Sequence, residues 1–193
     1  MKINKFVFPL PQNINMSIKS IAVFCGSKIG NNKIFEAHAK TIGHILANKN
    51  IKIIYGGADR GLMSTIANAG LEAGGTVIGV LPQLLKEIEL QHNGLSELYV
   101  VDTMHNRKQM LFNKCDGAII LPGGFGTLDE LFEMLTWNQL KIHEKKIFIL
   151  NSEGFYDHLL KHIFQMYESG FLYFHPDEII TVLNQPEELE NYI

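Results

Sequence analysis

Short apolar runs alternate along this chain with longer segments in which apolar residues recur every three or four positions. The runs lack a regular alternation of apolar and polar residues, which is typical of strands buried on both faces. The spacing in the longer segments predicts amphipathic helices. The predicted strands are Ser20–Cys25, Ile51–Tyr55, Thr76–Val80, Leu98–Val101, Ala118–Leu121, Lys146–Leu150 and Ile179–Val182.

The predicted helices lie between these strands. Asn31 or Asn32 can cap the first helix, and Gly74–Gly75 ends the second. The alternation of strands and helices predicts a doubly wound α/β fold, with about six or seven parallel strands and helices on both faces. Further helices are expected over about residues 105–113, 128–140 and 155–167, with a last helical turn from Pro186 and an irregular segment over Gln83–Glu97.

Composition narrows the class of protein. The chain has 193 residues, a hydrophobic fraction of 46% and a formal net charge of −3. This favours one domain over residues 18–193, preceded by a loosely ordered arm over residues 1–17. The charge gives no reason to expect a nucleic acid or a membrane as partner. With only two cysteines and no apolar run near the roughly 20 residues of a membrane helix, a cytoplasmic protein is expected.

The stretch Gly117–Leu140 is the strongest candidate for a binding site. A buried strand leads into three closely spaced glycines, Gly123, Gly124 and Gly126, and a helix follows them. This order directs free backbone N–H groups and the positive end of the helix dipole at whatever lies above the strand. Glycine also lets a ligand approach the backbone closely. The stretch therefore predicts an anion site, most naturally for a phosphate.

Thr127 and Glu130 admit two interpretations. Thr127 stands where an N-cap is expected and Glu130 follows three residues later, which is the pattern of a capping box. The alternative is a carboxylate held at the mouth of the phosphate site. The two interpretations do not exclude each other.

The glycine loop matches neither of the two best-known phosphate motifs. A dinucleotide pattern starting at Gly124 would need a third glycine at Asp129, and the chain has no Gly-Lys-Ser/Thr sequence of a P-loop. The loop therefore favours a mononucleotide or a sugar phosphate over NAD or ATP.

Two more glycine loops are expected at the same edge of the sheet, after the first strand (Gly26 and Ser27) and after the second (Gly56 and Gly57). The adjacent cations Arg107 and Lys108 follow the fourth strand and reach this edge as well. A solvated helix start would explain the pair, but the helix dipole disfavours cations there, which hints at a specific partner.

Other reactive side chains have simpler explanations. Cys25 is expected to be a buried, inert thiol, since no histidine is placed near it. His158 and His162 share a helix face but lack an obvious third ligand. Neither a metal nor a cofactor is expected.

Several motifs together resemble the LOG family of cytokinin riboside 5′-monophosphate phosphoribohydrolases, many of which were labelled lysine decarboxylases. The resemblance covers roughly residues 18–185. The matching segments are Pro122–Glu130 (P-G-G-x-G-T-x-x-E), Met104–Lys108, Val23–Ser27, Tyr55–Gly57 with Gly61–Met63, and Thr136–Leu140 followed by Ile142–His143.

The resemblance implies a Rossmann-like fold, a homodimer and hydrolysis of the N-glycosidic bond of a nucleoside 5′-monophosphate, AMP or a cytokinin riboside 5′-monophosphate. It implies that Arg107 and Glu130 are the essential pair and that Gly124–Thr127 hold the 5′-phosphate. The further residues that would bind substrate are Ser27, Gly57, Glu89, Lys108, Gly123, Phe125, Leu128, Asp129 and Thr136, of which Glu89 rests on spacing alone. Ala58 and Ser64 depart from the family pattern, both in the second loop.

Glycoside cleavage builds positive charge on the ribose, which a carboxylate at Glu130 would stabilise, while Arg107 would clamp substrate oxygens. A decarboxylase would need pyridoxal phosphate on a Schiff-base lysine with an acidic partner, and no such set is recognisable. A nucleotide-binding carrier or regulator without turnover is the alternative, although binding alone does not require the pair of Arg107 and Glu130.

Overall fold

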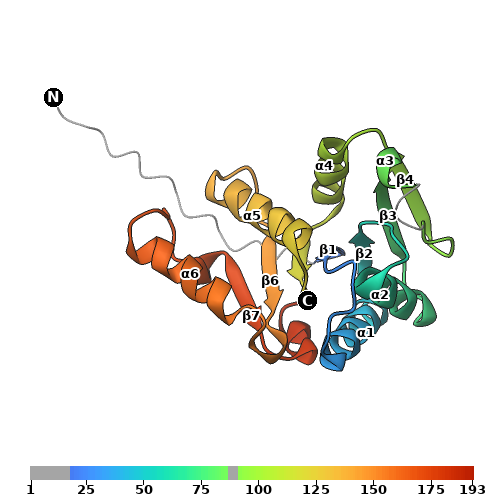
Figure 1. The fold of residues 1–193 in the computed structure, drawn as a ribbon, viewed down its shortest axis with the longest axis horizontal. Coiled ribbons are helices and arrows are strands. Elements are labelled where there is room, and N and C mark those ends of the chain that lie inside the picture. The colour runs from blue at the N-terminus through green and yellow to red at the C-terminus, as the bar shows by residue number, and fades with distance from the viewer. Residues whose placement is uncertain (1–17, 87–90) are drawn as a thin grey trace.

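A seven-stranded parallel sheet forms the centre of the protein, with the strand order β4-β3-β2-β1-β5-β6-β7 (Figure 1). The structure is a computed structural model that describes residues 18–86 and 91–193. The order and direction confirm the predicted doubly wound α/β fold. The strands are β1 (Ser20–Phe24), β2 (Lys52–Tyr55), β3 (Val77–Pro82), β4 (Glu97–Val101), β5 (Gly117–Ile120), β6 (Lys146–Leu150) and β7 (Ile180–Leu183).

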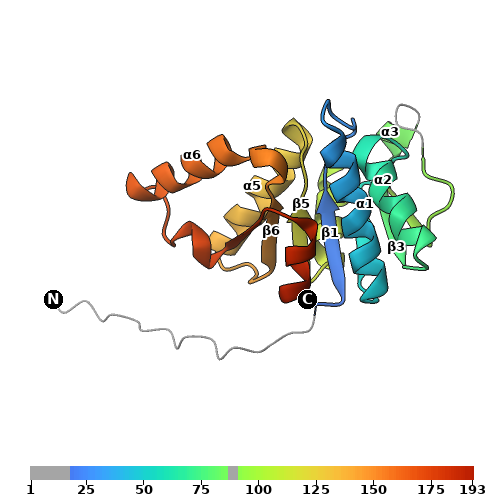
Figure 2. The ribbon, with the colours of Figure 1, turned by 90° about the horizontal axis from the view of Figure 1, so that it is seen from below.

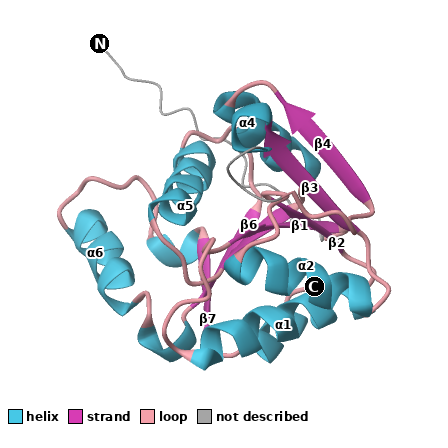
Figure 3. Cartoon of the chain, turned by 45° about the vertical axis from the view of Figure 1, so that its right-hand side comes forward, coloured by secondary structure: helices cyan, strands magenta, loops and turns pink. Residues whose placement is uncertain are grey.

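Helices cover both faces of the sheet, as the apolar runs predict (Figure 3). Along β1, Ile21 and Val23 enter the core beneath one set of helices, while Ala22 and Phe24 enter the core beneath the other. A strand such as β1, covered on both faces, therefore needs apolar residues at successive positions. One set consists of α1 (Lys33–Asn48) and α2 (Gly61–Glu72), and the other of α4 (Met104–Lys114), α5 (Phe125–Gln139) and α6 (Asp157–Glu168).

Side chains fix the starts of two of these helices. The Asn32 side chain accepts a hydrogen bond from the backbone N–H of Ile34 at 3.1 Å, so Asn32 rather than Asn31 caps α1. Thr103 caps α4 in the same way, by accepting from the N–H of Asn106 at 3.1 Å. Thr103 thereby fixes where the first turn of α4, which carries Arg107, begins.

Several segments differ from the sequence-based expectation or lie outside the described residues. The segment expected to be irregular begins with a short helix, α3 (Gln83–Lys86). The last helical turn is a 3₁₀ helix, η3 (Pro186–Asn191), which packs against α1 (Figure 2). The expected arm over residues 1–17 lies outside the described residues, as does Glu89. Two more short 3₁₀ helices are η1 (Ser152–Gly154) and η2 (Pro176–Glu178).

The strand order reverses between β1 and β5, which are neighbours in the sheet. The chain leaves β1 toward α1 on one face and leaves β5 toward α5 on the other, so the two loops diverge. In doubly wound sheets this reversal creates a crevice at the carboxyl ends of the strands. No helix within the described part of the chain combines the length and apolarity that crossing a membrane requires.

Candidate active site

Three loops meet at the carboxyl edge of the sheet, as the sequence predicts. The N–H of Gly26, after β1, donates to the carbonyl of Pro122, after β5, at 3.0 Å. The N–H of Leu62, at the start of α2, donates to the carbonyl of Gly26 at 3.1 Å. Gly61 has a φ of +54° and lies directly against the backbone of Ser27 and Lys28, so a side chain at Gly61 would be excluded. These contacts hold the three loops together as one surface.

The helix of the glycine loop starts earlier than the capping-box interpretation requires. Gly124 is the N-cap of α5, in an extended conformation and without a capping side chain. Thr127 is the third residue of the helix, so the interpretation of Thr127 as N-cap with Glu130 as its capping-box partner is wrong. Gly124 can begin the helix because a glycine N-cap needs no side-chain contact to be tolerated.

The early start leaves the end of α5 open to a ligand. The N–H groups of Phe125, Gly126 and Thr127 belong to the first turn, where a helix offers no internal acceptor. A Cβ atom on Gly124 or Gly126 would meet nothing within 4 Å, so neither glycine is required by packing. Open space, free donors and the positive helix end together make this a candidate anion site.

Glu130 faces Arg107 across the site. Nη1 of Arg107 donates to Oε1 of Glu130 at 2.8 Å, and the side chains are only 13% and 10% exposed. Nε of Arg107 also donates to the carbonyl of Val80, in β3, at 3.3 Å. The partner that the helix dipole argument anticipated for a cation at the start of α4 is therefore Glu130, and the pair joins α4 to α5.

Burial acts against the charge of Glu130. It raises the pKa of the Glu130 carboxyl above the usual range, and the positive charge and hydrogen bond of Arg107 oppose this effect. Burial, and secondarily the negative charge of Glu130, also raises the pKa of the Cys25 thiol. Cys25 is 8% exposed and stays protonated, which agrees with its interpretation as an inert thiol.

A hollow of about 260 Å³ lies between these groups. It contains seven of the residues proposed from the sequence: Ser27, Arg107, Gly124, Phe125, Gly126, Thr127 and Glu130. The remaining lining is mostly apolar and consists of Val23, Phe24, Cys25, Gly26, Gly56, Met63, Leu85 and Met104. A helix end that can hold a phosphate, a carboxylate and an apolar wall are the features expected of a site that binds a nucleotide.

The other proposed residues that the structure describes are not part of the lining of this hollow. Nζ of Lys108 is 2.9 Å from Oδ2 of Asp129 and 3.5 Å from Oε2 of Glu133, so the cation bridges α4 and α5 beside the main pair. The Leu128 side chain packs against the core. Thr136 is exposed, and its hydroxyl donates to the carbonyl of Phe132 at 2.6 Å.

Two glycines among the proposed residues shape the backbone. Gly57 has a φ of +81° and accepts a hydrogen bond from the N–H of His92 at 3.1 Å. Gly123 lines a second hollow, and a Cβ atom there would overlap the hydroxyl of Thr127.

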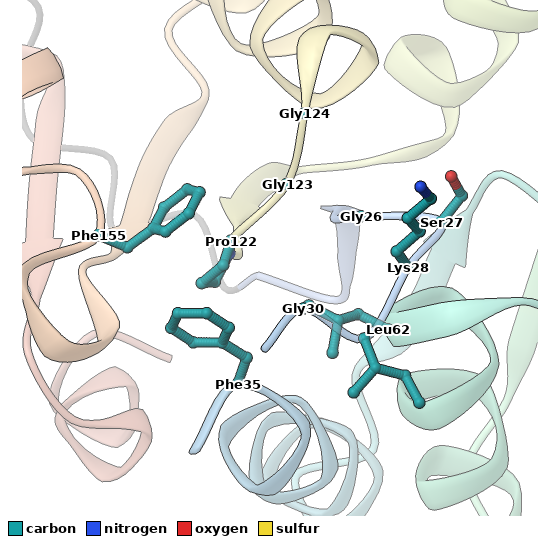
Figure 4. Close-up of a pocket in the computed structure, with 11 residues that line it drawn as sticks. Gly26, Ser27, Lys28, Gly30, Phe35, Leu62, Pro122, Gly123, Gly124 and Phe155 are labelled. Atoms are coloured by element: carbon teal, nitrogen blue, oxygen red, sulfur yellow. The ribbon is translucent and has the colours of Figure 1, made fainter. Parts of the chain in front are cut away.

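The second hollow is lined by residues of the loops after β1 and β5 together with Phe35 and Phe155 (Figure 4). Its volume is about 230 Å³, and the rings of Phe35 and Phe155 meet edge to face with their centroids 5.6 Å apart. It shares Gly26, Ser27 and Gly124 with the first hollow but includes neither Arg107 nor Glu130.

Sequence reasoning did not assign a role in the site to several residues of the first hollow. Gly56, Met63 and Met104 belong to the motifs of the resemblance, so the signal was present. Leu85 and the carbonyl of Val80 carry no sequence signal, because only the fold brings them here. Within residues 18–86 and 91–193, no three His, Cys, Asp or Glu side chains are grouped so that they could hold a metal ion.

The parallel sheet, the open end of α5 and the buried ion pair define a Rossmann-like α/β protein with a candidate anion site. Solved structures support this class. The molybdenum cofactor binding protein of Rippkaea orientalis superposes with a TM-score of 0.68 at 22% identity, covering 91% of this chain and 95% of that one. The molybdenum cofactor carrier protein of Chlamydomonas reinhardtii gives 0.67 at 18% identity, covering 90% and 96%. At this identity the likeness establishes the fold alone.

Sequence comparison identifies the family. Residues 63–193 match the family model described as "Possible lysine decarboxylase". The chain is 43% identical over 155 residues to the cytokinin riboside 5′-monophosphate phosphoribohydrolase of Rhodococcoides fascians, covering 80% of this chain and 78% of that protein. It is 41% identical over 154 residues to the enzyme LOG2 of Arabidopsis thaliana, covering 80% and 72%. The chain belongs to this family, the LOG family, which confirms the resemblance.

Proposed function

We propose that the protein hydrolyses the N-glycosidic bond of a nucleoside 5′-monophosphate, AMP or a cytokinin riboside 5′-monophosphate, to the free base and ribose 5-phosphate. The observation that carries this proposal is the buried pair of Arg107 and Glu130, 2.8 Å apart, beside the open end of α5. Relatives at 41–43% identity that bear the name phosphoribohydrolase support it.

Each group has a part in the proposed reaction. The 5′-phosphate binds the first-turn N–H groups of α5, which places the ribose next to Glu130, one turn further along the helix. As the bond between C1′ and the base breaks, positive charge develops on the ribose, and the Glu130 carboxylate stabilises it. A water oxygen then bonds to C1′ and loses a proton, while the base nitrogen released from C1′ takes up a proton, which gives ribose 5-phosphate and the free base. Arg107 holds Glu130 in place and contacts substrate oxygens.

The alternatives fit the site less well. A carrier without turnover does not need a carboxylate paired with an arginine in the hollow, and the solved molybdenum cofactor carrier protein is only 17–18% identical to this chain. A decarboxylase that uses pyridoxal phosphate needs a lysine for the Schiff base. No described residue that lines the first hollow is a lysine, and Lys108 is held by Asp129 and Glu133.

The proposal includes a homodimer in the cytoplasm, with no nucleic-acid or membrane partner. Exposed apolar side chains at the start of α4, along α5 and just after it support the dimer: Met104, Phe125, Phe132, Leu140 and Ile142. The low cysteine content and the net charge of −3 support the remainder.

The decisive experiment is incubation with AMP and with N6-isopentenyl-AMP, followed by chromatography for the free base. Both the base and ribose 5-phosphate are expected, and the nucleosides without phosphate should react far more slowly, because they cannot use the end of α5. Nucleotide binding without release of base would overturn the hydrolase and favour the carrier. A crystal soaked in AMP should show the phosphate at residues 124–127, and an anion found only elsewhere would contradict the site.

A further inference from the structure

The guanidinium of Arg107 is in contact with three elements besides its own helix. Nε donates to the carbonyl of Val80 at the end of β3, and Nη1 donates to Glu130 on α5. The third atom, Nη2, lies over the backbone of Gly56, which follows β2. The first two contacts are hydrogen bonds, whereas the third depends only on the absence of a side chain.

Gly56 leaves the space that the guanidinium fills. A Cβ atom at Gly56 would lie 2.5 Å from Nη2 and 3.6 Å from Cζ of Arg107. Its next neighbour would be the sulfur of Met63 at 3.2 Å, which a flexible side chain can move. A methyl group at Gly56 would therefore require the guanidinium to shift, and a shift changes the geometry of the hydrogen bonds that Nε and Nη1 make.

The backbone of Gly56 does not explain why this residue is glycine. Gly57, its neighbour, has a φ of +81°, which favours glycine by itself. Gly56 is not among the glycines with positive φ, so an alanine could adopt its conformation. What excludes a side chain at Gly56 is the space taken by Arg107.

We propose that Gly56 is a positioning residue that seats the guanidinium of Arg107 against Glu130. Its lack of a side chain gives Arg107 its one position between β2, β3 and α5. The catalytic consequence rests on the proposed function, whereas the seating itself does not.

A double-mutant cycle on thermal stability tests the seating without any assay of activity. Gly56→Ala should lower the melting temperature of the protein, because the methyl group displaces a buried guanidinium. In the Arg107→Ala background the same substitution should lower it by less than half as much, since the obstacle is gone. If Gly56→Ala prevents folding in the presence of Arg107 and permits it in its absence, the proposal is supported. An equal loss in both backgrounds, or failure to fold in both, overturns it.

The second test is kinetic and uses Gly70→Ala as matched control. A Cβ atom at Gly70 would lie 2.5 Å from Cδ1 of Ile53, an equally close contact in the core far from the hollow. Gly56→Ala should lower kcat by about 10-fold or more with a smaller change in KM, because a misplaced catalytic group acts mainly on the reaction step. Gly70→Ala should change stability alone.

The pH profile separates positioning from a general structural defect. Once Arg107 is displaced, its charge no longer opposes the effect of burial on Glu130, so the acid limb of kcat should move to higher pH in Gly56→Ala. An unchanged limb together with an unchanged kcat would refute the positioning role. Absence of base release by the wild-type protein would refute the proposed function instead, and the stability cycle would still decide the seating.

Discussion

Glu130 combines three conditions that bear on its charge. It is buried, it accepts a hydrogen bond from Arg107, and it lies on the second turn of a helix whose N-terminal end is open. Burial disfavours the carboxylate, while Arg107 and the positive helix end favour it. The result is a carboxylate poorly solvated by water and therefore effective on a nearby positive charge.

The substitution Glu130→Gln tests that charge. Glutamine keeps the size of the side chain and can still accept a hydrogen bond from Arg107. We expect turnover to fall by about 10²-fold or more, because the neutral amide cannot stabilise the developing charge on the ribose. Binding of AMP should persist, since the phosphate is held by the end of α5. Base release, AMP affinity and melting temperature should all be measured.

Glu133→Gln is the matched control for this variant. Glu133 lies one turn further along α5 and pairs with Lys108 at 3.5 Å rather than with Arg107. Glu133→Gln removes the same charge from the same helix but leaves the pair of Arg107 and Glu130 in place, so turnover should stay close to that of the wild type. Retained turnover in a folded, AMP-binding Glu130→Gln protein would refute the catalytic role of Glu130.

The rate should depend on pH through the ionisation of Glu130. Since burial raises the pKa of this carboxyl and the reaction needs the carboxylate, kcat should fall as the pH drops through the raised pKa. The acid limb is expected above the value of about 4.3 of an ordinary glutamate. The measurement should use kcat rather than kcat/KM, because the phosphate of the free substrate itself titrates at about pH 6. A limb at the ordinary value would contradict the effect of burial.

At the scale of elements, the position where α5 begins decides the nature of the site. If Thr127 were the N-cap, its side chain and that of Glu130 would satisfy the first N–H groups of the helix. Because the helix begins after Gly124 instead, these donors stay available and Glu130 turns toward Arg107. A shift of less than one turn in the start of α5 thus leaves backbone N–H groups free for an anion, instead of bonded to side chains of the same helix.

The start of α1 allows a clean test of capping. Asn32→Ala removes the acceptor of the Ile34 N–H and should lower the free energy of unfolding by about 1 kcal/mol. Asn31→Ala is the matched control, since Asn31 is also exposed but precedes the cap, and its effect should be much smaller. Urea unfolding of both variants would decide. Equal losses would contradict the assignment of Asn32 as the cap.

At the scale of the whole molecule, the two hydrophobic cores and the site all follow from the placement of helices on both faces of the sheet. Helices on both faces require a crossover to each face, and the two crossovers diverge between β1 and β5. The loops after these two strands therefore meet at the site, with Gly26 bonded to Pro122. The sheet positions the loops, and the helices α4 and α5 bring the charged groups to them.

The proposed dimer is a prediction at this scale. Phe132 on α5 and Leu140 just after it are 37% and 62% exposed, and burying such side chains favours association. Light scattering should give twice the mass of one chain, and the double variant Phe132→Glu with Leu140→Glu should give the mass of one. Phe171→Glu is the control, because Phe171 is 77% exposed but follows α6 and belongs to neither α4 nor α5. A monomeric wild-type protein at micromolar concentration would contradict the dimer.

The sequence by itself determined the class of fold and predicted an anion site. Seven apolar runs predicted the strands, because a strand between two layers of helices needs apolar residues at every position. Glycines in the loops after β1, β2 and β5 predicted where a ligand could approach, because a glycine loop before a helix has a local physical consequence. The motifs around Arg107 and Glu130 predicted the two charged residues of the site.

Only the tertiary structure decided how these residues meet. Arg107 and Glu130 lie on different helices, and their distance of 2.8 Å follows from the packing of α4 and α5 over the sheet. The contacts of Arg107 with the carbonyl of Val80 and with the space over Gly56 depend on the order of β2 and β3. Local rules did not predict the N-cap of α5 either, since both Gly124 and Thr127 can begin a helix and the surrounding loops select between them. Spacing along a chain fixes local geometry, whereas contacts between distant segments arise only when the layers pack.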